Sequence, residues 1–448
     1  MEREDVKNVY FVGIGGIGMS ALARYYQSRG WSVSGYDLTP SPLTRQLECE
    51  GMAIHYEDRP DLLPALIHLA IYTPAVPSTL GELQALRQRG VVLLKRAEAL
   101  GAISREHYTI AVAGTHGKTT TTAMVAHILK ENGVDLTAFI GGIANNFGSN
   151  LHLGRGPESV LVVEADEYDR SFLQLDPDIC IVNSIDADHL DIYGDRSHLV
   201  EGFNQFAALS HDCVLVKEGL PLEAAETPQL RFGLGSDNAF QATEIRQHDG
   251  ETDFVAIHGE ERTPVHLDMA GTHNVLNATA AFAATYTLGL APEGIAEALA
   301  TFRGVQRRFD VRVKNERHCY IDDYAHHPEE IKSCLSAIKT SFPSKRVTLV
   351  FQPHLFTRTR DFMEDFASAL AMADDLILLD IYPAREQPIE GVTSQALLDR
   401  IHIPNKCLCP KERLLELIDA RRPELLVTMG AGNIDRFVEP LQTMIRQW

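Results

Sequence analysis

The residue types best suited to chemistry stand in the run Ala-Gly-Thr-His-Gly-Lys-Thr at 113–119, between an apolar stretch and a predicted helix over 119–131. Backbone N–H groups of such a loop bind phosphate oxygens, Lys118 reaches the β and γ phosphates, and the Thr119 hydroxyl coordinates Mg²⁺. The full phosphate-loop pattern has a further glycine where this chain has Val112. An ordinary glycine turn with a surface lysine is the alternative, which the strand and helix context disfavours. We therefore expect ATP and Mg²⁺ at this loop.

A Mg²⁺ ion on a hydroxyl and phosphates usually keeps one or two protein carboxylates as well. Glu164 ends the apolar run 159–163, and Asp188-His189 follows the apolar run 178–183. A histidine taken alone is more often a hydrogen-bonded structural residue than a ligand. Its place after a neighbouring strand nevertheless makes His189, with Glu164 and Thr119, a candidate metal ligand.

Another glycine loop, the first along the chain, is Gly-Ile-Gly-Gly-Ile-Gly at 13–18; it lies between a predicted strand and a predicted helix, and Asp37 follows about 20 residues later. This is the pattern of a diphosphate cradle. On the motif alone, NAD, another nucleotide diphosphate and a merely structural turn all remain open. A hydride-transfer cofactor beside an ATP site would be unusual in one chain.

The elements that must position these loops follow an α/β pattern. Apolar strands alternate with helices, and short alternating strands between 231 and 269 indicate an antiparallel meander. We predict three domains: a Rossmann-like N-terminal domain (1–105), a phosphate-loop ATPase-type central domain with a mostly parallel sheet and a small antiparallel sheet (106–311), and a Rossmann-like C-terminal domain (312–448).

Composition excludes several classes of function. The formal charge of −20 disfavours a nucleic-acid partner, since a phosphate backbone needs a basic face. The charged N-terminus is not the pattern of a secretory signal, and no apolar run reaches the roughly 20 residues that span a bilayer. Seven scattered cysteines fit reduced thiols. We expect a cytoplasmic enzyme without a membrane partner.

Motifs along essentially the whole chain resemble those of the Mur ligases, and the first glycine loop and the His-His-Pro run resemble most the branch that adds L-alanine to UDP-N-acetylmuramate. In chain order these motifs are Gly-Ile-Gly-Gly-Ile-Gly-Met-Ser at 13–20, Gly-Thr-His-Gly-Lys-Thr at 114–119, Glu-Ala-Asp-Glu at 164–167, Asp-Ala-Asp-His-Leu-Asp at 186–191, His-Asn-Val-Leu-Asn-Ala at 273–278, Arg-Arg-Phe at 307–309, Asp-Asp-Tyr-Ala-His-His-Pro at 322–328 and Phe-Gln-Pro-His at 351–354.

The resemblance implies that the glycine loop at 13–18 binds a UDP-sugar and not NAD. It also assigns roles to residues in all three domains. It implies UDP-sugar contacts for Gly13, Gly15, Gly16, Gly18, Asp37, Thr73 and Arg96. It implies ATP contacts for Gly114, Thr115, His116, Gly117, Lys118, Thr119, Thr120, Asn274, Asn277, Arg307, Arg308 and Asp323. It implies that Tyr324, His326, His354 and Arg358 face the reaction centre, beside Lys118, Glu164 and His189.

Two departures from the family pattern bear on the substrate. Leu355 stands where many relatives have arginine, so Arg358 or Arg360 would have to compensate. Other Mur ligases carry a carbamoylated lysine after the Asp-His segment, whereas residues 190–210 contain no lysine. That absence agrees with the L-alanine-adding branch. A predicted helix begins at Pro328, so His326 and His327 can be explained as the residues that precede a helix N-terminus. A metal is not required to account for them.

The resemblance implies ATP-driven amide formation through an acyl phosphate. His326 or His354 would take the proton of the amine. The domains would close about the segment near Arg308. Three rivals remain: a recycling ligase that adds a preformed tripeptide, a nucleotide-binding regulator without catalysis, and an NAD-dependent oxidoreductase. We expect a monomer or a weak homodimer with three small-molecule substrates, ATP, UDP-N-acetylmuramate and L-alanine.

Overall fold

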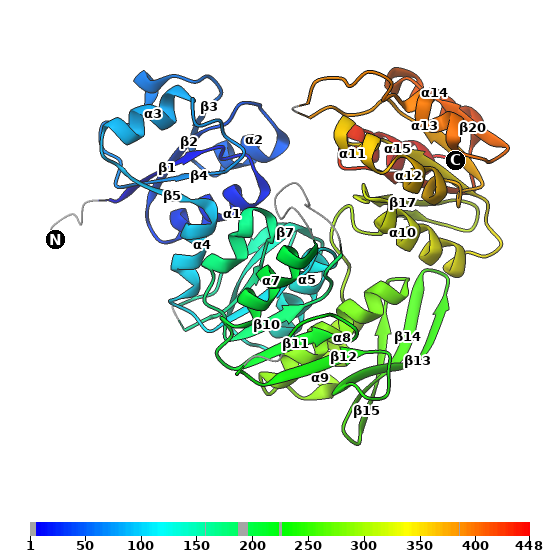
Figure 1. Cartoon of the computed structure of the whole chain (residues 1–448), viewed down its shortest axis with the longest axis horizontal. Helices are drawn as coiled ribbons and strands as arrows, with labels where there is room; N and C mark the ends of the chain where they lie inside the picture. Colours follow the sequence, from blue (N-terminus) through cyan, green and yellow to red (C-terminus); the bar gives the residue numbers. More distant parts are fainter. Residues whose placement is uncertain (1–5, 157, 187–195, 224–225, 385) are drawn as a thin grey trace. The chain divides into compact units, whose positions relative to one another are not determined.

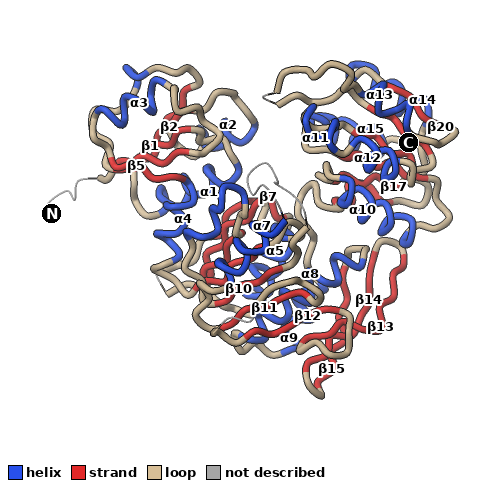
Figure 2. The backbone as a smooth tube through the Cα atoms, viewed as in Figure 1, coloured by secondary structure: helices blue, strands red, loops and turns tan. Residues whose placement is uncertain are grey.

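The computed structural model describes residues 6–156, 158–186, 196–223, 226–384 and 386–448. Its strands form three sheets that follow one another along the chain, each with helices packed against it (Figures 1 and 2). This is the predicted α/β architecture of three domains. By its internal contacts the chain divides into two compact units, the first dominated by residues 1–241 and the second by residues 299–448.

The N-terminal sheet has five parallel strands in the order β3-β2-β1-β4-β5. Its strands are β1 (Asn8–Val12), β2 (Ser32–Tyr36), β3 (Ala53–His55), β4 (Leu69–Tyr72) and β5 (Val92–Lys95), and its helices are α1 (Ile17–Ser28), α2 (Pro42–Cys49), η1 (Pro60–Leu62), α3 (Gly81–Gln88) and α4 (Arg96–Ser104). Because β1 lies between β2 and β4, the strand order reverses at β1. Ligands of such sheets bind at this reversal, beyond the carboxyl ends of the strands.

The middle sheet has ten strands in the order β15-β14-β13-β12-β11-β10-β6-β9-β7-β8. They are β6 (Thr109–Ala113), β7 (Leu136–Ala144), β8 (Ser149–His152), β9 (Val160–Glu164), β10 (Ile179–Val182), β11 (Cys213–Lys217), β12 (Gln229–Gly233), β13 (Phe240–His248), β14 (Glu251–His258) and β15 (Glu261–Leu267). The associated helices are α5 (Lys118–Glu131), η2 (Tyr168–Gln174), α7 (Arg196–Ala207), α8 (Thr272–Thr287) and α9 (Pro292–Ala300). The predicted meander, β13 to β15, extends the edge of this sheet and does not form a sheet apart.

The C-terminal sheet has the order β16-β17-β21-β18-β19-β20, and only β16 pairs antiparallel. Its strands are β16 (Asp310–Lys314), β17 (Cys319–Asp323), β18 (Val347–Phe351), β19 (Asp375–Leu378), β20 (Asn405–Leu408) and β21 (Leu425–Met429). Its helices are α10 (Pro328–Ser341), α11 (Phe356–Asp361), α12 (Met363–Leu370), α13 (Ser394–Arg400), η3 (Lys411–Arg413), α14 (Leu414–Arg421), η4 (Asn433–Phe437) and α15 (Val438–Ile445). Separate apolar clusters cover the two faces of this sheet.

One continuous apolar cluster joins the N-terminal domain to the middle sheet. The rings of Tyr25 on α1 and Phe139 on β7 have centroids 5.6 Å apart, and both side chains are buried. Helix α4 also packs against η2. The first two sheets therefore share a core, which explains why they form one compact unit. Among the described residues, no helix combines the length and the apolar character needed to cross a membrane.

The contact between α4 and η2 depends on a glycine. A Cβ atom on Gly101 would lie 2.1 Å from the carbonyl oxygen of Gln174, a backbone atom that cannot turn aside. We expect Gly101→Ala to lower the free energy of unfolding of this unit by about 1–3 kcal/mol, because overpacking outweighs the roughly 1 kcal/mol gain in helix propensity. Chemical denaturation measures the change. Gly156→Ala, where the added atom meets open space, is the matched control and should be nearly neutral; equal effects would contradict the packing argument.

Candidate functional site

The second glycine loop connects β6 to α5 in a conformation that requires its glycines. Gly114 has φ +138° and Gly117 has φ +82°. Gly117 is the N-cap of α5 and has no capping side chain, so the N–H groups of the first helical turn point toward the loop. A Cβ atom on Gly117 would lie 2.5 Å from Oδ1 of Asn277. The structure thus places predicted residue Asn277 against the loop.

Lys118 lies inside the loop and is held by two partners. Its Nζ donates to the Gly114 carbonyl at 2.7 Å and pairs with the Glu167 carboxylate at 2.7 and 3.0 Å. Glu167 is fully buried. Burial opposes the charged lysine, yet the carboxylates of Glu167, Asp166 and Glu164 together raise the pKa of Lys118. The ammonium therefore keeps its charge where a phosphate oxygen would need it.

Two hard oxygen donors meet beside Lys118. The Thr119 hydroxyl donates to Glu164 Oε2 at 2.8 Å, and Glu164 ends β9, which pairs with β6. Gly141 on β7 makes room for this carboxylate, since a Cβ there would lie 2.0 Å from Oε2. Hydroxyl and carboxylate oxygens suit Mg²⁺. His189 and Asp188 lie outside the described residues, and among those described no cluster of three or more His, Cys, Asp or Glu side chains forms a metal site.

The rest of the loop is fixed by residues that follow β10. Ser184 Oγ accepts the His116 N–H at 2.7 Å and lies 3.0 Å from the Thr115 hydroxyl. Asn183 donates to Thr121 at 2.9 Å. Asn183, Ser184 and Glu167 were not predicted as residues of this loop's surroundings. Their positions directly after β10 and β9 are the signal that could have identified them, because these strands flank β6.

The first glycine loop connects β1 to α1. Gly13 has φ +86° and donates its N–H to the Tyr36 carbonyl at 2.7 Å. The Gly15 N–H donates to Asp37 Oδ2 at 2.8 Å, so Asp37 folds back onto the loop. Gly16 is the N-cap of α1, again without a capping side chain. The loop leaves helical N–H groups for an anion, as a diphosphate cradle must.

Thr73 and Arg96 lie against this first loop. A Cβ atom on Gly13 would lie 2.6 Å from Thr73 Cγ2, and one on Gly18 would lie 2.8 Å from a terminal nitrogen of Arg96. These close approaches explain why glycine stands at both positions. Arg96 begins α4, and its guanidinium also donates to Asp166 at 2.9 Å.

In the second compact unit, the Arg-Arg-Phe segment is held by two aspartates of β17. Arg307 Nε donates to the buried Asp322 carboxylate at 3.1 Å, and Asp323 accepts the N–H groups of Phe309 at 2.6 Å and Ala325 at 2.7 Å. Burial raises the pKa of Asp323 to about 6. Asp323 therefore anchors backbone within its own unit, which is a positioning role for the loop that carries Arg307.

Tyr324 and the predicted histidines gather at the carboxyl ends of β17 and β18. The guanidinium of Arg308 lies 5.1 Å from the Tyr324 ring centre, and Tyr324 packs edge-on against His326 at 5.2 Å. The ring centroids of His326 and His354 are 6.1 Å apart, and His354 stacks on Tyr382 at 5.7 Å. The two histidines are therefore neighbours. Asn274, by contrast, bonds the Ala270 carbonyl of its own helix start at 2.7 Å.

The two histidines have different electrostatic surroundings. Burial lowers the pKa of His354 to about 4, with His326 and Arg358 adding to the effect. Burial also lowers the pKa of His326, but Glu330 opposes this shift, with Oε2 3.4 Å from Nδ1. His326 Nδ1 lies 3.0 Å from the Tyr324 carbonyl oxygen, which favours a proton on Nδ1 and leaves Nε2 basic.

Leu355, the departure from the family pattern, has an unusual backbone. Its φ is +71° and ψ is 137°, a region costly for any residue with a side chain. Its N–H donates to Tyr382 and its carbonyl accepts from Thr359, and these bonds hold the strained turn beside His354. Arg360 pairs with its neighbour Asp361 at 2.7 Å. Arg358 is therefore the better placed of the two arginines to act beside the histidines, because it adds to the lowering by burial of the pKa of both His326 and His354.

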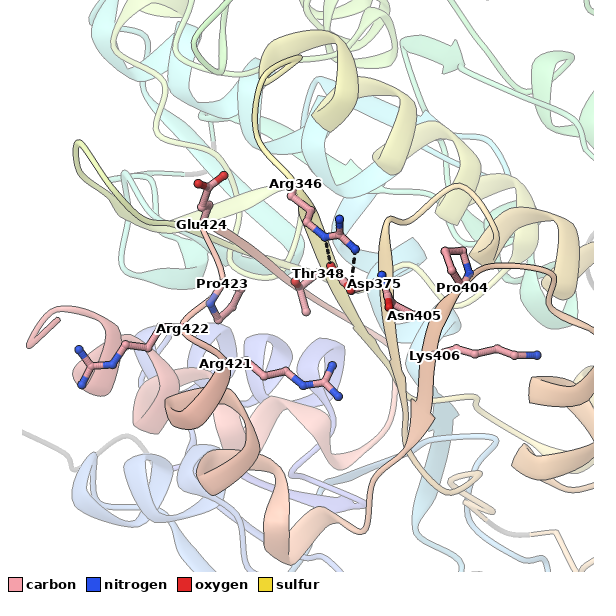
Figure 3. Close-up of a pocket in the computed structure, with 10 residues that line it drawn as sticks. All are labelled: Arg346, Thr348, Asp375, Pro404, Asn405, Lys406, Arg421, Arg422, Pro423 and Glu424. Carbon is pink, nitrogen blue, oxygen red and sulfur yellow. Dashed lines mark hydrogen bonds and ion pairs between the residues drawn. The ribbon is translucent and has the colours of Figure 1, made fainter.

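A pocket of about 610 Å³ on the C-terminal domain lies elsewhere (Figure 3). Its lining includes Arg346, Asp375, Asn405 and Glu424, which stand at the amino ends of β18, β19, β20 and β21. Arg346 is already neutralised by two hydrogen bonds to Asp375. Ligands of parallel sheets bind at the opposite, carboxyl ends. No predicted site residue lines this pocket, and we do not assign the chemistry to it.

Comparisons with known proteins give a consistent match. Three family models cover the chain in order: "Mur ligase family, catalytic domain" at residues 8–108, "Mur ligase middle domain" at 112–285, and "Mur ligase, glutamate ligase domain" at 307–432. The chain is 48% identical to the UDP-N-acetylmuramate--L-alanine ligase of Flavobacterium psychrophilum over 98% of both chains, and 45% identical to that of Flavobacterium johnsoniae over the full length of both.

Solved structures agree. The UDP-N-acetylmuramate-alanine ligase of Thermotoga maritima superposes with a TM-score of 0.82 at 29% identity, covering 97% of this chain and 99% of that one. A murein peptide ligase from Psychrobacter arcticus has a TM-score of 0.74 at 23% identity, covering 98% of both chains. The second likeness concerns the fold alone.

Proposed function

This chain belongs to the Mur ligase family, and we propose that it joins L-alanine to the lactyl carboxylate of UDP-N-acetylmuramate with ATP as the energy source, in peptidoglycan synthesis. One observation carries the proposal: two separate glycine-loop cradles, each at a helix N-terminus, lie in one compact unit of an acidic chain. Relatives 43–48% identical over nearly their whole length bear the L-alanine ligase name.

In the proposed reaction, a carboxylate oxygen of the muramate attacks the γ-phosphorus of ATP, and ADP leaves. The alanine nitrogen then attacks the carbonyl carbon, the carbon–oxygen bond breaks, and inorganic phosphate leaves with that oxygen. Lys118 and the N–H groups of α5 neutralise the transferring phosphoryl group, since phosphoryl transfer needs mainly positioning and charge stabilisation. The first loop, with Thr73 and Arg96, holds the UDP-sugar.

A Mg²⁺ ion held by Thr119, Glu164 and the phosphates would neutralise charge on the triphosphate. The two described donors fit this ion, because both are hard oxygens that lie within 2.8 Å of each other. His189 completes the proposed set. The remaining nucleotide contacts assigned to Asn274, Arg307, Arg308 and the anchor Asp323 belong to the same proposal.

We assign the amine proton to Nε2 of His326, because Glu330 Oε2 lies 3.4 Å from Nδ1 of His326 and the Tyr324 carbonyl favours a proton on that Nδ1. The rate should therefore rise with pH as His326 loses its proton, with a midpoint below its ordinary 6.5, since burial lowers that pKa. We expect His326→Gln to lower kcat about 100-fold and to remove this acidic limb. Rate–pH profiles of the variant and of a control, His402→Gln at an exposed histidine, check this; an unchanged acidic limb in His326→Gln would exclude His326 as the base.

The experiment that tests the function is phosphate release with substrates omitted one at a time. Release should require ATP, Mg²⁺, UDP-N-acetylmuramate and L-alanine together. The rival recycling ligase would use the preformed tripeptide in preference to L-alanine, so competition between these acceptors separates the two. A nucleotide-binding regulator would bind both nucleotides and release no phosphate, and an oxidoreductase would change nicotinamide absorbance.

The two nucleotides would bind the first compact unit, whereas His326 belongs to the second, so the reaction requires these groups to come to near-attack distance without water. We propose that the C-terminal domain, from residue 312, closes on residues 106–311 through the segment near Arg308, while residues 1–105 hold the UDP-sugar. Small-angle scattering should show compaction when both nucleotides are present. No change in the radius of gyration would count against closure.

A further inference from the structure

Two cations proposed to bind phosphate are each held by a carboxylate, and the two carboxylates are neighbours in sequence. Arg96 donates to Asp166 at 2.9 Å, and Lys118 pairs with Glu167 at 2.7 Å. Arg96 belongs to the N-terminal domain and Lys118 to the middle domain, whereas both carboxylates stand on the single turn that follows β9. No role was predicted for either carboxylate.

Each ion pair also touches one of the two glycine loops. The Arg96 guanidinium lies against Gly18 of the first loop, so closely that a Cβ there would lie 2.8 Å from its nitrogen. Lys118 Nζ donates to the carbonyl of Gly114 in the second loop at 2.7 Å. A chain of direct contacts therefore runs from one anion cradle to the other through Asp166 and Glu167.

The turn that carries these carboxylates is tied to the N-terminal domain a second time and is conformationally strained. Lys95, which precedes Arg96, pairs with Asp169 at 3.3 Å. Asp169 and Arg170 both have left-handed backbones, with φ of +54° and +53°. Consecutive non-glycine residues in this region cost free energy and persist only where their surroundings hold them. The ion pairs of Asp166, Glu167 and Asp169 are such surroundings.

We propose that Asp166 and Glu167 are positioning residues that couple the UDP-sugar cradle to the ATP cradle. Without nucleotides, the two carboxylates hold the cations in place of phosphate oxygens. A diphosphate that draws Arg96 away from Asp166 releases the shared turn, which lowers the cost of releasing Lys118 from Glu167 for the triphosphate. Each nucleotide then strengthens the binding of the other, and by thermodynamic linkage the two factors are equal. The inference rests on the proposed function, because it takes the two ligands from it.

A purely structural role for these pairs is less consistent with their placement. An exposed ion pair contributes little to stability, so Lys95–Asp169 alone would explain nothing. Burying a charged carboxylate such as Glu167 costs desolvation free energy, which the ion pair with its partner often does not exceed. A buried pair is therefore weak evidence for a role in stability. Here Glu167 pairs with the Lys118 ammonium at the phosphate loop, and the adjacent residue, Asp166, neutralises Arg96 at the other loop.

Calorimetric titration of the full chain tests the coupling. The probe is the non-hydrolysable β,γ-imido analogue of ATP with Mg²⁺, titrated without and with saturating UDP-N-acetylmuramate, and then in the reverse order. We expect each ligand to tighten the binding of the other by about tenfold in the native protein. In Asp166→Asn both ligands should still bind singly, with UDP-N-acetylmuramate at least as tight, and the coupling factor should fall to about one.

The matched control is Asp61→Asn, which removes the carboxylate of an exposed arginine pair at Arg59 and should leave the coupling intact. Coupling of equal size in Asp166→Asn and the native protein would overturn the inference. So would native protein that binds both nucleotides independently, a result that leaves the proposed function standing and needs no variant to fold. Failure of either nucleotide to bind the native protein would overturn the proposed function, and the coupling with it.

Discussion

Replacing Lys118 by alanine is expected to lower kcat for phosphate release by at least about a thousandfold. Loss of a single neutral donor to a developing oxyanion already costs about 10²–10³. Lys118 carries a full charge, which three nearby carboxylates reinforce by raising its pKa. Among the described residues, no other lysine or arginine belongs to the phosphate loop or to the first turn of α5. A coupled phosphate-release assay at saturating substrates measures the loss.

A second variant separates this catalytic loss from misfolding. Lys118→Ala alone removes the ammonium that pairs with the buried Glu167 carboxylate, which should destabilise the unit by about 3–5 kcal/mol. Lys118→Ala combined with Glu167→Gln removes that charge as well, so stability should recover. Activity should stay lost. A double variant that regained activity would show that Lys118 serves the fold and not the reaction.

The second large effect is expected at Glu164. Glu164→Gln keeps an oxygen that can accept from the Thr119 hydroxyl but removes the negative charge that a divalent cation requires. We expect kcat to fall about 100-fold, because the cation that stabilises the transferring phosphoryl group would lose a fixed ligand. The Mg²⁺ concentration for half-maximal activity should rise. Titration of activity with Mg²⁺ measures both quantities.

Glu158→Gln provides the control for Glu164, because Glu158 is exposed and precedes the opposite end of the same strand β9. It should leave the rate and the Mg²⁺ requirement unchanged. An independent readout is the affinity of the β,γ-imido analogue of ATP with and without Mg²⁺. If Glu164→Gln preserved the full gain in affinity that Mg²⁺ confers on the native protein, Glu164 would not be a metal ligand.

The features predicted well from sequence are those that neighbouring residues determine. Each glycine loop, the strand before it and the helix after it are local, so the pattern sufficed to place β1 and α1, and β6 and α5. The three-domain α/β class was confirmed by the fold and by the comparisons. The family resemblance was likewise confirmed. The roles of individual site residues stay predictions.

The features that could not be predicted from the sequence depend on contacts between distant segments. The pair between Lys118 and Glu167 joins residues 49 positions apart, and only the parallel pairing of β6 with β9 brings them together. Arg96 and Asp166 also form an ion pair although they are 70 positions apart in the sequence. Leu355 was noticed as a missing arginine, but its left-handed backbone follows from the hydrogen bond to Tyr382, which no local pattern shows.

The central claim, that the muramate carboxylate is activated by phosphoryl transfer from ATP, can be tested with oxygen isotopes. UDP-N-acetylmuramate labelled with ¹⁸O in its lactyl carboxylate is turned over with ATP, Mg²⁺ and L-alanine, and the products are analysed by mass spectrometry. The account predicts one labelled oxygen in each inorganic phosphate released. Unlabelled phosphate, or label that appears in AMP, would contradict it.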